Sequence, residues 1–226
     1  RSNNYICHFF VVRREIAEKT GGLRPEYNGA QDYDYIFRCT EMAGKIVHIP
    51  RVLYHWRVHS ASTADNPASK LYAYEAGKKA IEGNLARCGE EGTVTLRSDY
   101  GFYDVDYKLQ GTPLVSILIP NKDQADTLRT CLESIQKKCT YPSYEILIIE
   151  NNSTEEATFS YYKEIEAQGI RVLKYPEQGF NYSAINNFGV KEAKGEYLLF
   201  LNNDMEIITP DFMEKMVSNL QRPQIG

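Results

Sequence analysis

The sequence predicts an α/β protein in which a mostly parallel β-sheet is flanked by helices. The main observation is a set of short apolar runs in the second half, of the kind found in strands buried on both faces. These runs are 114–119, 144–149, 170–175 and 197–201. Helical patterns separate the runs, and strands that alternate with helices favour a parallel sheet with helices on both sides.

The helices between these runs are predicted from apolar spacing and from residues that favour helix starts. After the first run, apolar residues recur at i, i+3, i+4 and i+7, which places them on one face of a helix. They are Leu128, Cys131, Leu132 and Ile135. Ser153 and Glu156 have the spacing of a capping box, which predicts the start of the next helix. Ser183 can cap a third helix, and Pro210 is typical of the start of a fourth.

The first half of the chain has a less regular pattern. We expect one helix from Asp32 to about residue 43 and a longer one from Pro67 to about residue 87. Short strands are expected at 9–12 and 46–49. Residues from about 88 to 112 are rich in glycine and charge, so we expect them to be a connector.

Composition and charge narrow the class of protein. The chain has 226 residues and a net charge of −4 with no basic block, so we do not expect a nucleic-acid partner. Its five scattered cysteines form no C-x-x-C pair, which favours reduced thiols in a cytosolic protein over disulfides or a zinc site. No apolar run approaches the ~20 residues that cross a bilayer. Because the sequence starts at Arg1 without an initiator methionine, we interpret it as an excised fragment.

Polar clusters follow each of the predicted strands of the second half. The clusters are 120–123, 150–153, 180–183 and 202–204. Any one of them could be a simple turn, because Asn, Asp and Ser favour turns whatever the function. In an open parallel sheet, however, ligands bind beyond the carboxyl ends of the strands. Four clusters at one edge therefore predict a ligand site.

The motifs of the second half resemble those of family 2 glycosyltransferases. The strand Val-Ser-Ile-Leu-Ile-Pro at 115–120, the Glu-Asn-Asn-Ser-Thr at 150–154 and the Asn-Asn-Asp at 202–204 occur in the order and spacing of that family. The resemblance also includes Phe-Asn-Tyr-Ser at 180–183 and Asn-Phe-Gly at 187–189, and it covers the whole of residues 113–226. It implies a GT-A-like, Rossmann-like fold.

The resemblance also implies a donor site with a metal ion. Glu150 would accept hydrogen bonds from uracil N–H or ribose hydroxyls. Asp204, with Asn202, stands at the family's D-x-D motif and would bind Mn²⁺ or Mg²⁺, cations that take oxygen ligands. The ion would neutralise charge on the departing nucleoside diphosphate. The other donor-binding residues implied are Pro120, Asn121, Asp123, Asn151, Asn152, Asn187 and Asn203.

The first half resembles a later part of the same family. Gly-Ala-Gln-Asp-Tyr-Asp at 29–34, followed by Arg38, is similar to a motif in which an acidic pair opens a helix near the acceptor. Gln31 replaces the first acid, and Asp32 matches the general base, which implies inversion by a single displacement. Without the resemblance, Asp32 would be interpreted first as a helix N-cap.

Residues 48–62 resemble the end of the catalytic domain in that family. His59 matches a histidine that completes the metal shell. The resemblance implies that Trp56 and Arg57 would lie near the acceptor and the diphosphate. The forked donors of arginine suit phosphate oxygens.

The order of the two halves predicts a tandem protein. In the family the nucleotide half comes first, whereas here the order is reversed. We therefore expect residues 1–90 to be the acceptor-side half of an upstream glycosyltransferase domain, 91–112 a linker, and 113–226 the nucleotide-sugar-binding half of the next domain. A further hypothesis is that the two halves associate, within one chain or in a domain-swapped homodimer.

The expected function is sugar transfer from a UDP- or dTDP-linked donor to a saccharide or lipid-linked acceptor. Family resemblance implies a bacterial enzyme of surface polysaccharide or cell-wall synthesis, cytoplasmic or peripheral to the inner face of the membrane. The alternative is a nucleotide-binding module without turnover, or an inactive fragment, which the neutral Asn202 and Gln31 favour. A dinucleotide oxidoreductase is disfavoured, because residues 121–129 contain no glycine.

Overall fold

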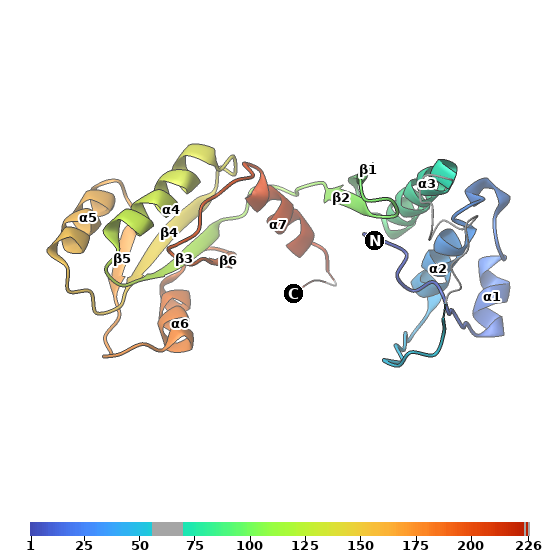
Figure 1. Cartoon of the computed structure of the whole chain (residues 1–226), viewed down its shortest axis with the longest axis horizontal. Coiled ribbons are helices and arrows are strands. Elements are labelled where there is room, and N and C mark those ends of the chain that lie inside the picture. The colour runs from blue at the N-terminus through green and yellow to red at the C-terminus, as the bar shows by residue number, and fades with distance from the viewer. Residues whose placement is uncertain (56–69, 224, 226) are drawn as a thin grey trace. The chain divides into compact units, whose positions relative to one another are not determined.

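The computed structural model describes residues 1–55, 70–223 and 225, which form two units. Unit 1 is Arg1–Lys108 and unit 2 is Leu109–Gly226 (Figure 1). Each unit has its own buried apolar core, so each is described separately.

Unit 2 is built on a four-stranded sheet in the order β5-β4-β3-β6, with every neighbouring pair parallel. The strands are β3 (Val115–Asn121), β4 (Tyr144–Glu150), β5 (Arg171–Lys174) and β6 (Tyr197–Phe200). The predicted parallel sheet is therefore confirmed. In the register of the central pair, Asn121 lies opposite Glu150, so the polar ends of both strands reach the same edge.

Helices cover both faces of this sheet (Figure 1). They are α4 (Ala125–Lys138), α5 (Glu156–Ala167), α6 (Tyr182–Glu192) and α7 (Phe212–Leu220). Successive side chains of a strand point to opposite faces. Ile117 and Ile119 pack in the core formed with α4, α5 and α7, whereas Leu118 packs in the core that contains Ile185 of α6. The central strands are thus buried on both sides, which explains their continuous apolar sequence.

The predicted helix caps of unit 2 are wrong. The N-cap of α5 is Glu155 without a side-chain cap, because the Ser153 hydroxyl accepts a hydrogen bond from the backbone N–H of Asp123 instead. The N-cap of α6 is Asn181, whose side chain accepts from the N–H of Ala184, so Ser183 lies inside the helix. Each predicted N-cap lies two residues from the observed one, and helix ends are the part of a helix that the sequence specifies least sharply.

Unit 1 consists of helices and one β-hairpin. Its elements are α1 (Arg14–Thr20), η1 (Pro25–Tyr27), α2 (Gln31–Met42), α3 (Leu71–Cys88), β1 (Gly92–Leu96) and β2 (Tyr103–Tyr107). The two helices predicted at 32–43 and 67–87 correspond to α2 and α3 over the described residues. Residues 9–12 and 46–49 form no strand; Ile46 and Ile49 are exposed, and the described residues provide no neighbouring strand to bond their backbone.

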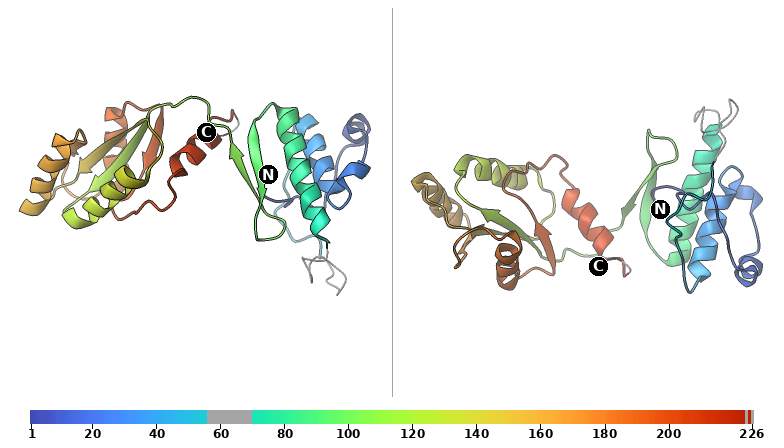
Figure 2. Two further views of the ribbon diagram at one scale, coloured as in Figure 1. Left: turned by 90° about the horizontal axis from the view of Figure 1, so that it is seen from above. Right: turned by 60° about the horizontal axis from the view of Figure 1, so that its bottom comes forward.

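The segment expected to be a linker contains the antiparallel hairpin β1–β2, which packs along α3 (Figure 2). Its strands alternate, with Val94 and Tyr103 buried against Ile81 and Leu85 of the helix. The Tyr103 hydroxyl donates to the carbonyl oxygen of Tyr74 at 3.0 Å. These residues therefore belong to the core of unit 1, because a period-two pattern buries one face of a hairpin.

All five cysteines are free in the structure. Within the described parts of the chain, none of the helices combines the length and apolarity that crossing a membrane requires.

Candidate functional site

The predicted donor-site residues of unit 2 gather at the carboxyl edge of the sheet. Pro120 and Asn121 are the last residues of β3, and Glu150 is the last of β4. The N–H of Asn151 donates to the carbonyl oxygen of Asn121 at 2.9 Å, which extends the ladder into the loops. The sequence was sufficient to predict this position, because the carboxyl ends of parallel strands lie at the same edge of a sheet.

The loop after β4 turns tightly around a buried carboxylate. Glu150 is 4% exposed, and one of its carboxylate oxygens accepts from the N–H of Ser153 at 2.5 Å. Asn152 has a φ of 60°, a left-handed conformation that asparagine tolerates better than most residues. Its side-chain amide donates to the Asn151 side chain and to the carbonyl oxygen of Glu177.

Asp123 connects the loop after β3 to the start of α5. Its Oδ1 accepts from the N–H of Thr154 at 2.7 Å and from the N–H of Glu155 at 2.9 Å. These backbone hydrogen bonds lower the pKa of Asp123, since they favour its charged form. Asp123 and Gln124 both have positive φ values, 53° and 57°, so this rim holds strained backbone of the kind that concentrates at functional sites.

The low pKa of Asp123 predicts a pH-dependent contribution to the stability of unit 2. The unfolded-state pKa is about 4. The contribution is therefore full above that pH and is lost as pH falls through the lower folded-state pKa. Denaturant unfolding of wild type and Asp123→Asn should show a stability difference that is constant near neutrality and shrinks below about pH 4. Asp126→Asn is the matched control; a difference for Asp123→Asn that does not change with pH would contradict this assignment.

In the segment 202–204, the middle residue is anchored and the outer two are exposed. The Asn203 amide donates to Oδ1 of Asn121 at 2.7 Å. Asn202 accepts from the Tyr182 hydroxyl at 3.3 Å, and the Asp204 carboxylate makes no hydrogen bond or ion pair with the described residues. The alternation leaves two oxygen-bearing side chains, at i and i+2, facing solvent, a donor set that suits Mg²⁺ or Mn²⁺.

Of the remaining residues predicted for the donor and metal sites, only Asn187 is among the described residues. Asn187 is an exposed residue of α6, and no hydrogen bond within the described chain joins it to the three loops. Trp56, Arg57 and His59 lie outside the described residues. Among the described residues there is no group of three or more His, Cys, Asp or Glu side chains placed to hold a metal ion.

Asp32, the predicted general base, lines a cavity of unit 1. The cavity has a volume of about 640 Å³, and its walls mix tyrosine rings with polar groups. Lining residues include Asn4, Cys7, Gln31, Asp32, Tyr72 and Tyr103. The side chain of Asn4 donates to Oδ2 of Asp32 at 3.1 Å, and Oδ1 accepts from the N–H of Tyr33. The carboxylate is thus oriented and remains accessible from the cavity.

Cys7 supports the same carboxylate. Burial, together with the hydrogen bond and charge of Asp32, raises the pKa of Cys7 to about 12. The thiol therefore stays protonated near neutral pH and can donate to Asp32.

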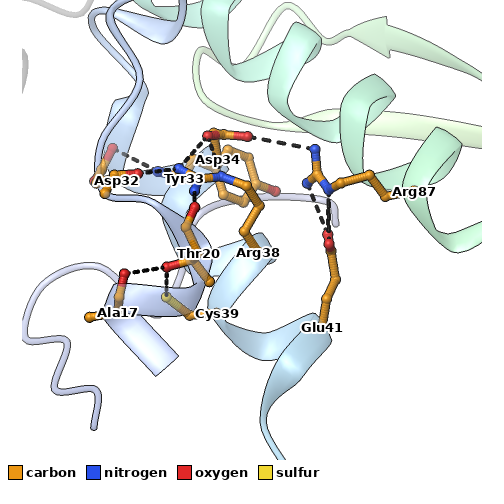
Figure 3. Close-up of polar contacts among 10 residues, drawn as sticks. Ala17, Thr20, Asp32, Tyr33, Asp34, Arg38, Cys39, Glu41 and Arg87 are labelled. Atoms are coloured by element: carbon orange, nitrogen blue, oxygen red, sulfur yellow. Dashed lines mark hydrogen bonds and ion pairs between the residues drawn. The ribbon is translucent and has the colours of Figure 1, made fainter. Parts of the chain in front are cut away.

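The helix that carries Asp32 is fixed by a buried ion pair in its next turn. Asp34 is fully buried and Arg38 is 4% exposed, and Nε of Arg38 donates to Oδ2 of Asp34 at 2.9 Å (Figure 3). The same guanidinium donates to the carbonyl oxygens of Thr20 and Gly22 at 2.5 and 2.6 Å. These carbonyls end α1, so Arg38 ties α1 to α2.

A second arginine approaches Asp34 from α3. Figure 3 shows Asp34 between the side chains of Arg38 and Arg87. Arg87 lies 3.7 Å from Oδ1 of Asp34 and pairs with Glu41 at 2.8 Å. Asp34 and Arg38 are therefore structural, whereas Asp32 faces the cavity from the same helix start.

Four side chains that contact these groups had no role assigned to them from the sequence: Asn4, Cys7, Tyr162 and Tyr182. Each of them contacts a predicted site residue that lies at least 20 positions away in the sequence. No local pattern marks such contacts, because they depend on which loops the fold brings together.

Comparisons with known proteins agree with the geometry of unit 2. Residues 116–225 match the family model "Glycosyl transferase family 2". The whole chain is 43% identical over 226 residues to the O-antigen biosynthesis protein RfbC of Myxococcus xanthus, of which it covers 18%. Glycosyltransferase AglE of Haloferax volcanii is 32% identical over 100 residues, which are 41% of this chain and 31% of that protein.

The solved structures similar to this chain include a mannosyltransferase from Pyrobaculum calidifontis in complex with GDP-Man and Mn²⁺. It matches with a TM-score of 0.45 and 18% identity, over 70% of this chain and 44% of that one. The chain therefore spans less than half of the length of each of these proteins.

Proposed function

We propose that this chain, whose residues 116–225 match the model of glycosyl transferase family 2, is part of an enzyme that transfers a sugar from a nucleotide-diphosphate sugar to an acceptor hydroxyl. The observation that carries the proposal is the arrangement at the carboxyl edge of unit 2. There, one buried carboxylate, Glu150, ends β4, and one outward-facing carboxylate, Asp204, follows β6; these two parallel strands lie on either side of β3. This is the edge at which open α/β sheets bind nucleotides.

The donor contacts follow from the groups left available there. A carboxylate oxygen of Glu150 accepts hydrogen bonds only, so it suits the N–H of uracil or thymine, or ribose hydroxyls. From the family resemblance we propose that the donor is a UDP- or dTDP-linked sugar. The backbone of Pro120 and the side chains of Asn152 and Asn187 would contribute further polar contacts.

Asp204 and Asn202 would hold Mn²⁺ or Mg²⁺ against the diphosphate. Their oxygens are exposed at i and i+2, and the Asp204 carboxylate has no internal partner among the described residues, which fits a hard cation. Such an ion would neutralise charge on the leaving nucleoside diphosphate. Tyr182 orients the Asn202 side chain, and Asn203 holds the segment to Asn121. We place His59 in the same kind of site in the upstream domain.

In unit 1 we propose that Asp32 takes the proton from the acceptor hydroxyl. The hydrogen bond from Asn4 and the protonated Cys7 orient the carboxylate, and the tyrosine-lined cavity suits a saccharide ring. Attack by the deprotonating hydroxyl on the anomeric carbon would invert its configuration. Trp56 and Arg57 would lie near the acceptor and the diphosphate.

We further propose a tandem organisation, in which unit 1 is the acceptor half of one domain and unit 2 the nucleotide half of the next. The M. xanthus relative supports it, since the alignment runs through both units in the same order and this chain covers 18% of that protein. Association of the halves in a domain-swapped homodimer remains a hypothesis, and its test is the mass of the chain in solution. The name of the same relative favours surface polysaccharide as the product.

Calorimetric titration of the chain with UDP, dTDP and GDP, each with and without Mn²⁺, tests the donor site. We expect metal-dependent binding of a uridine or thymidine diphosphate. Asp204→Ala should weaken it by about 100-fold, because it removes the only charged ligand we assign to the ion, a loss of roughly 3 kcal/mol. Asp211→Ala removes an acid outside the rim loops, whose side chain is 51% exposed, and it should bind like wild type. Equal affinity with and without metal would contradict the metal assignment.

The competing function is a nucleotide-binding module without turnover, which the neutral Asn202 and Gln31 favour. Sugar transfer by a longer protein that contains this chain distinguishes the two. Nucleotide binding without transfer to any saccharide or lipid-linked acceptor would favour the binding module.

A further inference from the structure

The loops at the carboxyl edge of unit 2 converge on one buried hydroxyl group. Tyr162 of α5 is 4% exposed, and its ring packs in the core beneath the sheet. Its hydroxyl accepts from the side-chain amide of Asn121 at 2.8 Å and lies 3.4 Å from the hydroxyl of Ser153. One side chain thereby contacts the ends of β3 and β4 together.

From these two contacts the network reaches all three loops. Oδ1 of Asn121 accepts from the Asn203 amide at 2.7 Å, which connects the loop after β6. Oγ of Ser153 accepts from the N–H of Asp123 at 2.9 Å, which connects the loop after β3 a second time. Asn121 is 2% exposed, and its amide group is fully occupied by Tyr162, Asn203 and the carbonyl oxygen of Asp123.

The directions of the hydrogen bonds are consistent through the network. Burial raises the pKa of Tyr162, so its hydroxyl keeps its proton near neutral pH. It accepts from Asn121 and can donate to Ser153, whose oxygen has a second lone pair for the N–H of Asp123. Every member is therefore satisfied, and such networks order the segments that they join.

We propose that the hydroxyl of Tyr162 is a positioning group that holds the loops after β3, β4 and β6 in the arrangement that binds ligand. Asn121 then acts within the protein and contacts the ligand only through its neighbours. The effect on ligand binding rests on the proposed nucleotide-sugar function, whereas the ordering of the loops does not. No residue of this network other than Asn203 lies in the segment assigned to the metal.

The chain contains a matched control next to Tyr162. Tyr161 is also 4% exposed and lies on the same helix, but its hydroxyl makes no hydrogen bond with the described residues. Its ring instead lies 4.0 Å from the guanidinium of Arg129. Replacing either tyrosine by phenylalanine keeps the ring and removes one oxygen, so the two variants differ only in the hydrogen bonds lost.

Amide hydrogen exchange of the whole chain tests the ordering directly. Tyr162→Phe should raise exchange in residues 121–124, 151–155 and 201–204 together by about tenfold, the scale expected for one buried hydrogen bond. Tyr161→Phe should leave these segments unchanged. Ser153→Ala should raise exchange in the first two segments. In the double variant Ser153→Ala with Tyr162→Phe, the free-energy change measured by exchange should be smaller than the sum of the changes in the two single variants, because both side chains belong to one network.

Unchanged exchange in Tyr162→Phe, or an equal rise in Tyr161→Phe, would overturn the proposal. Titration with UDP and Mn²⁺ tests its consequence, and Tyr162→Phe should weaken binding by about tenfold at a temperature where both proteins are folded. If wild type binds no nucleotide, the proposed function fails while the exchange experiment still decides the positioning role. If exchange rises but affinity is unchanged, the role of Tyr162 in ligand binding is overturned.

Discussion

Replacing Asp32 by asparagine is expected to lower the kcat of sugar transfer by about 10²- to 10⁴-fold in a longer protein that contains this chain, the usual contribution of a general base. Asparagine has the same shape but cannot accept the proton of the acceptor hydroxyl. The donor affinity should change little, because donor contacts are assigned to other residues. The measurement is steady-state transfer with separate determination of kcat and of KM for the donor.

The control for Asp32 is Glu26→Gln, the same acid-to-amide change at an exposed position of η1. It should retain wild-type kcat, since Glu26 does not line the cavity. The kcat of Asn4→Ala should lie between those of Asp32→Asn and Glu26→Gln, because this change removes the hydrogen bond that orients the Asp32 carboxylate. Wild-type kcat in Asp32→Asn would show that another group takes the proton.

Replacing Arg38 by methionine is expected to destabilise unit 1 by roughly 3–5 kcal/mol, the cost of leaving a buried charge without its partner. Asp34 would keep only Arg87, at 3.7 Å, and the carbonyls of Thr20 and Gly22 would lose their donors. Hydrogen exchange of the most protected amides of α2 measures this loss. The protected amides of α4 in unit 2 should be unaffected.

Two further variants test whether the loss of stability is specific to the buried Asp34–Arg38 pair or is common to any ion pair on a helix. Lys137→Met breaks another i,i+4 pair, with Glu133 on α4, whose side chains are 70% and 46% exposed. It should cost at most a few tenths of a kcal/mol, about what exposed helix pairs contribute. The double replacement Asp34→Leu with Arg38→Met should recover part of the stability lost in Arg38→Met. A small loss in Arg38→Met alone would contradict the structural role assigned to the pair.

The local sequence was sufficient to predict the sheet of unit 2. Strands buried on both faces are mostly apolar, so β3 and β4 contain the uninterrupted apolar runs 117–119 and 146–149. Since the strands are parallel, the polar residues that follow them must meet at one edge. The positions of Glu150 and of the segment 202–204 followed from this rule alone.

The hairpin of unit 1 was not predicted, because its local sequence pattern is weak and its formation also depends on packing against a helix. Thr93, Val94 and Thr95 alternate as a half-buried strand does, but glycine and charge dominate the segment around them. Packing against α3 stabilises the hairpin, because Ile81 and Leu85 of that helix bury Val94 and Tyr103. Two strands alone are marginal in water and need such a surface.

The sequence by itself determined which residues lie at the rim of unit 2, because that depends on strand order and on the two-residue period of strands. Only the tertiary structure decided what each of them does there. Asn121 and Ser153 are used inside the protein and Asp204 faces solvent, although all three are polar residues at strand ends. The reason is that a polar side chain takes its role from its hydrogen-bond partners. For Asn121 those partners include Tyr162 and Asn203, which are brought to it by folding from 41 and 82 positions away.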